Sequence, residues 1–324
     1  MPTATPQVQT PKEESINESV LQNQAISVGH MYRDRVAKTP NAPAYQFAHV
    51  KPEGDTWETI TWAQTKERTD AISAGLIALG VQPEQRVAIA SSTRLEWAFA
   101  DLANMTAAAA TTTIYPTTMA DDVAFIISDS DSRVVFAENA DQVDKLRGIK
   151  DKTPSVVKVV VFDATGVDTD DWVMTLADLE AMGKEYLAAN PGAIDARIDG
   201  ITGDMLATLI YTSGTTGQPK GVRLLHKSWG YEGAATEAIG ILNSDDLQYL
   251  WLPLAHVFGK LLLTLPIQIG FPTAIDGRID KIVDNLAVVK PTFMGAAPRI
   301  FEKAYGRIKM MMEGEGGVKL KLFN

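Results

Sequence analysis

The 324-residue sequence contains no cysteine and only four histidines. Without cysteine, the protein has no disulfide bond, no thiolate nucleophile and no cysteine-ligated metal site. His30 and His49 stand isolated in the sequence, and no histidine is spaced with acidic residues in the way that zinc ligands are. This composition fits a reducing compartment, and we expect the protein to be cytoplasmic.

Positive charge is also scarce, because 40 acidic residues outweigh 30 basic ones and give a formal net charge of −10. Binding to nucleic acid is therefore disfavoured, since it needs a basic surface that replaces the counterions on phosphate. The longest apolar stretch, residues 261–275, is interrupted by two prolines and a glycine and is too short to span a bilayer. We expect no transmembrane segment, while peripheral contact with a membrane stays open.

The first 27 residues are polar and contain no apolar core, so we predict a disordered tail rather than a secretory signal. The remaining chain, residues 28–324, is rich enough in hydrophobic residues to bury a large core. A turn-rich stretch at residues 190–203 suggests two sub-regions within it, 28–195 and 200–324.

Strand-like and helical patterns alternate along the chain. Two strand-like runs at residues 44–50 and 56–62 flank a turn signal and predict a hairpin, and helical spacing predicts a helix at 63–79. Short apolar strands and amphipathic helices then follow in turn, and a β-branched run at 156–162 indicates a strand buried on both faces. The alternation predicts an α/β fold of βαβ units, with mostly parallel sheets covered by helices.

The most specific stretch is YTSGTTGQPKGV at residues 211–222. Its glycines let the backbone come close to an anion and point successive N–H groups at it. Its hydroxyl groups add hydrogen-bond donors, and Lys220 adds a mobile positive charge. An apolar run at 205–210 precedes the loop and a helical pattern at 226–241 follows it. The order of strand, glycine-rich loop and helix is typical of phosphate binding.

Two other interpretations of this loop fail on spacing. In a Walker A loop, Gly-Lys-Ser/Thr follows the first glycine after four residues, but Pro219 stands where the second glycine should be. Ser213 lacks the Gly-x-Ser-x-Gly elbow of a serine hydrolase. A surface loop that binds no ligand remains the alternative.

The stretch at residues 211–222 resembles the signature of the adenylate-forming, AMP-binding superfamily. That superfamily includes acyl-CoA synthetases, aryl-CoA ligases, luciferases and the adenylation domains of peptide synthetases. Three further segments resemble its bacterial long-chain fatty acyl-CoA synthetase branch, namely TTTIYPTTMADDVAFIISDSDSRVVFAE at 111–138, LPLAHVFGK at 252–260 and APRIFEKAY at 297–305. The resemblance runs from about residue 31 to the end of the sequence.

The resemblance implies a ligase that uses ATP and Mg²⁺ to activate a long-chain fatty acid as an acyl-adenylate and then transfers it to coenzyme A. The phosphate loop would consist of Thr212, Ser213, Gly214, Thr215, Thr216, Gly217 and Lys220, with Thr212 the hydroxyl nearest to Mg²⁺. His256 would line the pocket where the carboxylate meets the α-phosphate, although a lone histidine in apolar company is more often a core residue. An acyl channel would be bordered by Phe258, Leu261, Leu262 and Leu265, whose near-helical spacing fits a plain core helix equally well.

Several parts of the family pattern have no counterpart in this sequence. They are the glycine-rich stretch that cups the adenine, the Tyr-Gly-x-Thr-Glu strand, the aspartate that holds the ribose, and the small C-terminal domain with its catalytic lysine. We therefore expect residues 28–324 to be the N-terminal part of an AMP-binding domain and to be catalytically incomplete alone. The alternatives are a non-catalytic nucleotide- or acyl-binding fragment and a relative of the aryl-CoA ligases.

Overall fold

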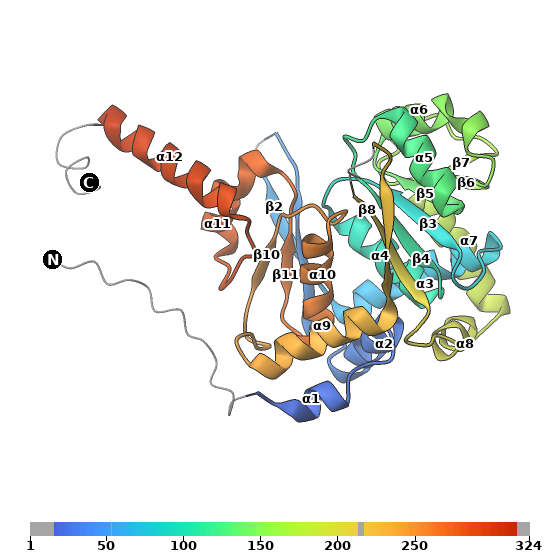
Figure 1. The fold of residues 1–324 in the computed structure, drawn as a ribbon, viewed down its shortest axis with the longest axis horizontal. Coiled ribbons are helices and arrows are strands. Elements are labelled where there is room, and N and C mark those ends of the chain that lie inside the picture. Colours follow the sequence, from blue (N-terminus) through green and yellow to red (C-terminus); the bar gives the residue numbers. More distant parts are fainter. Residues whose placement is uncertain (1–15, 53, 213–216, 316–324) are drawn as a thin grey trace. The chain divides into compact units, whose positions relative to one another are not determined.

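The computed structural model describes residues 16–52, 54–212 and 217–315 (Figure 1). The chain divides into two compact units, residues 1–293 and 294–324. The first unit contains both β-sheets, and the second contains helix α12 (Pro298–Glu315). No helix among the described residues is both long and apolar enough to cross a bilayer.

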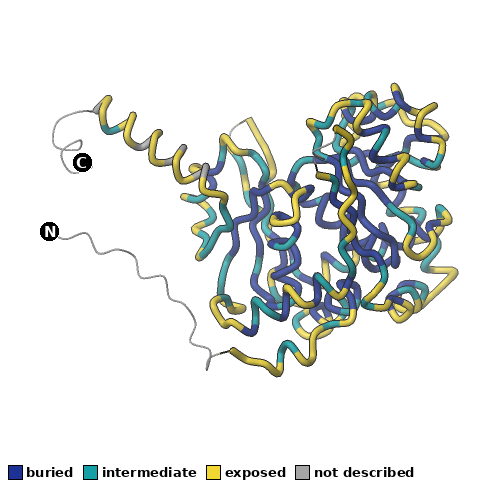
Figure 2. The backbone as a smooth tube through the Cα atoms, viewed as in Figure 1, coloured by how far each residue is buried: buried dark blue, intermediate teal, exposed yellow. Residues whose placement is uncertain are grey.

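The larger sheet of the described chain has seven strands in the order β7-β6-β5-β3-β4-β8-β9. These strands are β3 (Arg86–Ala90), β4 (Ala110–Ile114), β5 (Ser132–Ala137), β6 (Lys158–Val161), β7 (Val173–Thr175), β8 (Leu206–Thr212) and β9 (Lys220–Leu225). All neighbouring pairs are parallel except β8 and β9, which are antiparallel. The central strands are buried (Figure 2), and most of them are therefore nearly continuous apolar runs, although β4 buries three threonines.

Helices cover both faces of this sheet (Figure 1). Helix α4 (Leu95–Thr106) connects β3 to β4, and α5 (Ala120–Ser130) connects β4 back to β5 on the other side of β3. Because the two right-handed crossovers run in opposite directions, the two helices lie on opposite faces. Apolar residues of α5 and α6 (Ala140–Gly148) share one core with β3, β5 and β6. On the other face, α3 (Trp62–Ala78) packs against α4 and α7 (Leu176–Ala189).

The smaller sheet has four strands in the order β10-β11-β1-β2 among the residues described. They are β1 (Pro43–His49), β2 (Thr56–Thr61), β10 (Gln248–Leu250) and β11 (Thr273–Ile275). The expected hairpin is present as β1 and β2, and β1 pairs in parallel with β11 on its other side. Beside this sheet, three helices pack against one another, namely α2 (Val28–Lys38), α9 (His226–Ile239) and α10 (Val257–Ile269). The prediction of an α/β fold with mostly parallel sheets is confirmed.

The glycine-rich loop is placed differently from the sequence expectation. Strand β9 intervenes between the loop and α9, so the loop connects two antiparallel strands rather than a strand and a helix. The helix expected at 226–241 is confirmed as α9, and only the strand that precedes it was not expected. Residues KGVRLL of β9 pair with the outer edge of β8, and this pairing satisfies backbone groups that would otherwise be left open.

Two other predicted boundaries also differ. The turn-rich stretch at 190–203 contains α8 (Ala193–Asp199), which buries Ile194 and Ile198 one helical turn apart. The sub-regions 28–195 and 200–324 are not separate bodies, because β1 pairs with β11 and β4 pairs with β8 across that point. In the predicted polar tail, α1 (Glu18–Gln22) is helical, so the tail prediction does not hold there, while residues 1–15 lie outside the described range.

The carboxyl ends of the two sheets meet along one seam. Thr93, just after β3, donates its hydroxyl to the carbonyl of Leu252 at 2.7 Å. Thr113 of β4 donates to the carbonyl of Ala255 at 3.0 Å. These buried bonds fix the segment that follows β10 against the larger sheet. Ligands of parallel α/β sheets bind at this edge, so the seam is where a site is expected.

Candidate functional site

A cavity of about 540 Å³ lies on the seam beside the β8–β9 hairpin, and we call it the hairpin pocket. It brings together the loop after β4, the end of β8, the inner face of β9 and the start of α10. Its lining residues are Tyr115, Ile210, Tyr211, Thr212, Val222, Leu224, His256 and Val257. The structure thus places two of the predicted site residues, Thr212 and His256, on one pocket.

Helix α10 begins at this pocket. His256 is its N-cap, and the Nδ1 atom of His256 accepts a hydrogen bond from the N–H of Phe258 at 3.2 Å. The helix approaches the preceding turn closely because residue 259 is glycine, where a Cβ would lie 2.2 Å from the carbonyl oxygen of Pro253. The N–H groups of a helical first turn carry partial positive charge, so an anionic group in the pocket would be stabilised.

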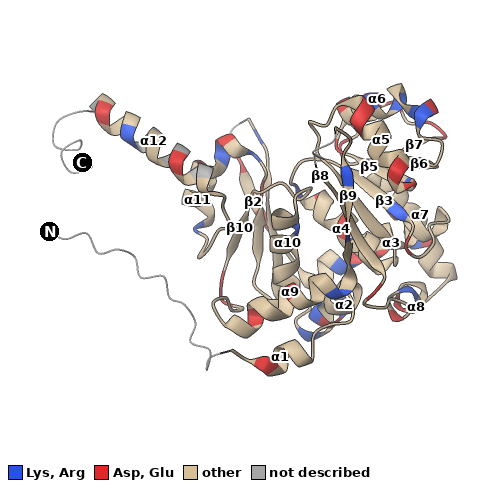
Figure 3. Ribbon diagram, viewed as in Figure 1, with Lys and Arg blue, Asp and Glu red and all other residues tan. Residues whose placement is uncertain are grey.

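The hairpin adds a full positive charge. Lys220 is directly opposite Thr212 in the β8–β9 pairing, a position about 5 Å away in such pairs. Because side chains alternate along a strand, Lys220 shares a face of β9 with Val222 and Leu224, which line the pocket. Arg223 belongs to the opposite face. Figure 3 marks basic residues on β9 in blue.

The centre of the predicted phosphate loop lies outside the described residues, namely Ser213, Gly214, Thr215 and Thr216. Gly217 is the first described residue after them and is exposed, with a φ of 95°. The role of all five in phosphate binding stays a prediction. The hairpin, rather than a following helix, presents this loop, and the helix N-terminus at the pocket belongs to α10.

A second cavity of about 240 Å³ adjoins the hairpin pocket, with which it shares Leu224 and Val257. We call it the apolar pocket, and its lining residues are Leu224, Ser228, Trp229, Glu232, Val257, Phe258 and Leu261. Of the predicted channel residues, Phe258 and Leu261 line it. Leu262 and Leu265 are not among its lining residues, and they are 5% and 4% exposed in the core. Their part in an acyl channel stays a prediction.

Sequence reasoning missed Tyr115, Tyr211 and Trp229 as lining residues. Tyr115 follows a parallel strand, and that position at the carboxyl end was an available signal. Its loop is held by Lys145, whose Nζ donates to the carbonyls of Pro116 at 2.8 Å and Thr118 at 2.9 Å. The contribution of Trp229 depends on how α9 and α10 pack, and no local pattern reveals that packing.

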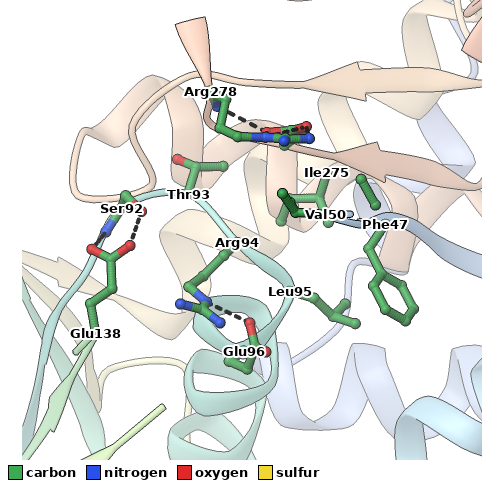
Figure 4. A pocket seen from close by; sticks show the side chains of 12 residues that line it. Phe47, Val50, Ser92, Thr93, Arg94, Leu95, Glu96, Glu138, Ile275 and Arg278 are labelled. Carbon is green, nitrogen blue, oxygen red and sulfur yellow. Dashed lines mark hydrogen bonds and ion pairs between the residues drawn. The ribbon is translucent and has the colours of Figure 1, made fainter. Parts of the chain in front are cut away.

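A third cavity, of about 260 Å³, lies at the ends of β3, β5 and β11 (Figure 4). The chain leaves β3 toward β4 and then returns to β5 on the other side, so this cavity is at the topological switch point of the sheet. Its charged groups already have partners: Arg94 donates to Glu96 at 2.6 Å, Arg278 donates to Asp276 at 2.9 Å, and Glu138 accepts the N–H of Ser92 at 2.9 Å. This mutual pairing makes it a weaker candidate for an anionic ligand than the hairpin pocket.

The hairpin pocket offers little to a metal ion by itself. Its described lining residues include the Thr212 hydroxyl but no carboxylate. No group of three histidine, aspartate or glutamate side chains could hold a metal in the part of the chain described. Magnesium is usually bound through carboxylates, waters and substrate phosphates, so one hydroxyl does not make a site. The assignment of Thr212 to Mg²⁺ stays a prediction.

His226, the first residue of α9, is buried. Its Nδ1 accepts a hydrogen bond from the N–H of Val28 at 3.4 Å. Burial, reinforced by the positive charge of Lys260 and by His30, lowers the pKa of His226 from 6.5 to about 3. The imidazole is therefore neutral at physiological pH and connects α9 to the start of α2.

This pKa predicts a loss of stability in mild acid. The unfolded chain takes up a proton near pH 6.5, whereas folded His226 does not until about pH 3, so protons favour unfolding in this range. The free energy of unfolding should fall by about 1.4 kcal/mol per pH unit below pH 6.5, or about 2 kcal/mol by pH 5. Urea unfolding of wild type and His226→Gln at these pH values measures it.

The variant should lose most of this pH dependence. His49→Gln is the matched control, because His49 is exposed, and it should keep the wild-type slope. An unchanged slope in His226→Gln would show that other groups cause the acid sensitivity.

Known proteins resemble this chain over most of its length. The family model described as "AMP-binding enzyme" matches residues 32–320. The long-chain-fatty-acid–CoA ligase FadD15 of Mycobacterium bovis is 30% identical over 282 residues, which cover 83% of this chain and 46% of that protein. Fatty acyl-CoA synthetase A of Dictyostelium discoideum is 28% identical over 284 residues, covering 83% and 40%. The chain spans about half the length, or less, of the curated relatives it matches.

Solved structures share the fold. A long-chain-fatty-acid-CoA ligase (FadD1) from Archaeoglobus fulgidus matches with a TM-score of 0.73 at 20% identity, over 88% of this chain and 54% of that one. The A domain of a carboxylic acid reductase from Segniliparus rugosus, solved with AMP and a co-purified carboxylic acid, matches with a TM-score of 0.76 at 19% identity, over 95% and 55%. These likenesses show the fold alone. Since the family model covers nearly the whole sequence, this chain belongs to the AMP-binding enzyme family.

Proposed function

We propose that this chain supplies the phosphate loop and the acyl pocket of an AMP-forming long-chain fatty acid–CoA ligase. In that reaction, a fatty acid carboxylate attacks the α-phosphate of ATP and pyrophosphate leaves. The thiol of coenzyme A then attacks the acyl carbon of the adenylate, and AMP leaves. The observation that carries the proposal is that a pocket with donors for an anion adjoins a pocket with apolar walls. The names of the curated relatives support the long-chain acid as substrate.

The hairpin pocket suits the phosphates. The Thr212 hydroxyl lines it, the first turn of α10 begins beside it, and Lys220 supplies a positive charge from the position opposite Thr212. Fixed donors of this kind stabilise charge without reorganising during the reaction. Mg²⁺ would neutralise further phosphate charge when bound, but the described residues of this pocket do not form a site for it. We therefore assign no step to the metal.

His256 stands where the two pockets adjoin. It lines the hairpin pocket, and the next two residues, Val257 and Phe258, line the apolar pocket. A carboxylate at this junction would have the imidazole beside it and its alkyl chain among apolar side chains. We propose that His256 orients the carboxylate toward the α-phosphate, since holding two reactants in the geometry of attack lowers the barrier to such a transfer.

The acyl chain would occupy the apolar pocket between α9 and α10. Each methylene group removed from water contributes about 0.8 kcal/mol. Phe258 and Leu261 would therefore add to the affinity for the acyl chain without orienting it. We further propose that the protein works in the cytoplasm and takes its fatty acid from the membrane surface, into which such acids partition.

Binding to this chain tests the two pockets separately. Lys220→Ala should weaken ATP binding by about 10-fold to 100-fold, the cost of one charge-assisted hydrogen bond, and leave palmitate binding unchanged. Leu261→Trp should weaken palmitate binding and spare ATP, because a larger ring fills the apolar pocket. Isothermal titration calorimetry measures both affinities.

Arg223→Ala is the matched control, because Arg223 is on the same strand but on the other face. It should bind ATP nearly as wild type does. The loss in Lys220→Ala should shrink at high salt, where an electrostatic contact is screened. Equal losses in the two variants would contradict a phosphate site in the hairpin pocket. Tighter binding of benzoate than of palmitate would favour an aryl-CoA ligase instead.

A further inference from the structure

A buried ion pair lies next to the apolar pocket. The Nζ atom of Lys260, on α10, is 2.6 and 2.5 Å from the two carboxylate oxygens of Asp101, on α4. The two side chains are only 1% and 4% exposed. Thr111 of β4 donates a further hydrogen bond to Asp101 at 2.7 Å. Burial lowers the pKa of Lys260, and the carboxylate of Asp101 opposes that shift.

Such a pair adds little to stability, because the cost of removing two charges from water offsets most of their attraction. Such a pair can instead fix the conformation of its neighbours. The neighbours of Lys260 include two tryptophan rings. The ammonium group lies 5.3 Å from the ring centre of Trp229 and 5.9 Å from that of Trp97. Cations attract aromatic faces at this distance.

The indole of Trp229 is held at two points. Lys260 lies over its face, and its Nε1–H donates to the hydroxyl of Thr208, on β8, at 3.2 Å. Trp229 is 2% exposed, yet it lines the apolar pocket together with Phe258 and Leu261. It is therefore the buried part of the pocket wall, and its ring connects that wall to the ion pair.

We propose that Lys260 and Asp101 are positioning residues that fix the indole of Trp229 and so set the length of acyl chain that the apolar pocket accepts. This inference rests on the proposed function, because it takes the pocket to hold an acyl chain. A rigid ring gives the pocket a definite depth. A ring free to change its rotamer would let longer chains enter, and the preference for one length would broaden.

Two variants loosen the ring in different ways. Thr208→Val removes the hydrogen bond to the indole and keeps the shape of the side chain. Lys260→Met combined with Asp101→Leu removes both charges together, so no unpaired charge stays buried. Thr106→Val is the matched control, because Thr106 is a buried residue of α4 whose hydroxyl donates within its own helix.

The first measurement is displacement of dansyl-undecanoic acid from the chain by saturated fatty acids from octanoate to stearate. For wild type, affinity should rise by about fourfold per methylene up to one length and then fall. In Thr208→Val and in the double variant, the decrease in affinity should begin at longer chains or disappear. Thr106→Val should keep the wild-type profile.

The second measurement is fluorine NMR of fluorotryptophan-labelled protein, with the Trp229 signal assigned by its loss in Trp229→Phe. We expect one sharp signal in wild type and in Thr106→Val, and a broadened or split signal in both loosened variants. This readout needs no fatty acid, and a merely structural loss elsewhere would not move it.

The outcomes separate the two hypotheses. If both variants keep the wild-type length profile, the proposed specificity is wrong, whatever the Trp229 signal does. If the Trp229 signal is also unchanged, Lys260 and Asp101 do not position the ring. If no fatty acid displaces the probe from wild type, the proposed function fails and the length preference fails with it. The Trp229 signal then decides the positioning role alone.

Discussion

Replacing Asp101 alone by leucine is expected to lower the free energy of unfolding by about 3–5 kcal/mol, because the ammonium group of Lys260 then stays buried without its partner. Lys260→Met alone should cost a similar amount by stranding the carboxylate. The double variant should recover most of this loss. A remaining cost of about 1 kcal/mol is expected, since the hydroxyl of Thr111 loses its acceptor.

A double-mutant cycle from urea unfolding measures this coupling. The expected result is a double variant that is more stable than either single variant. If the two losses in the free energy of unfolding simply add, Lys260 and Asp101 do not stabilise each other, even though both side chains are buried. The cycle also shows whether the double variant is stable enough to be used in the fatty acid and NMR measurements.

Gly183→Ala is expected to destabilise the protein by about 3 kcal/mol, at the upper end for overpacking. The reason is the close approach of α7 to α3, where a Cβ on residue 183 would lie 1.8 Å from the carbonyl oxygen of Ala71 and 2.7 Å from the backbone nitrogen of Gly75. Both obstacles are backbone atoms, which cannot turn away as a side chain could. The two helices would have to move apart.

The midpoint of thermal unfolding compares this variant with Gly148→Ala. Gly148 is also helical, but a Cβ there would meet no atom within 4 Å. The control should be neutral or more stable by up to about 1 kcal/mol, because alanine favours a helix over glycine. Similar losses in both variants would mean that helix propensity, and not the α3–α7 contact, decides the result.

Local patterns predicted the elements that depend on neighbouring residues. The helix expected at 63–79 and the strand expected at 86–90 are present as α3 and β3, because apolar spacing and turn residues determine both within one segment. Strand β9 was missed because KGVRLL has no strong strand pattern of its own, and it forms by pairing with β8. Its existence depends on the edge that β8 offers, which the local sequence does not reveal.

The candidate site could also be predicted only in part. The resemblance alone pointed to Thr212 and His256, and the structure brings them to one pocket. The side of α10 that lines the pocket could not be predicted, because Phe258 and Leu262 are both apolar and differ only in which neighbour they meet. Lys260 had one visible signal, a single charge within an apolar run. Its partner Asp101 is more than 150 residues earlier in the chain, and only the fold brings the two together.

The pairing of β1 with β11 has a consequence for how the chain is made. Tyr45 of β1 pairs with Thr273 of β11, more than 200 residues later. A ribosome adds about 5–20 residues per second, so β1 and β2 wait on the order of tens of seconds before their partner strand exists. Throughout that interval one edge of β1 offers unpaired backbone groups to any passing chain. The smaller sheet is therefore the later of the two sheets able to form during synthesis, and its nascent hairpin keeps one edge open until then.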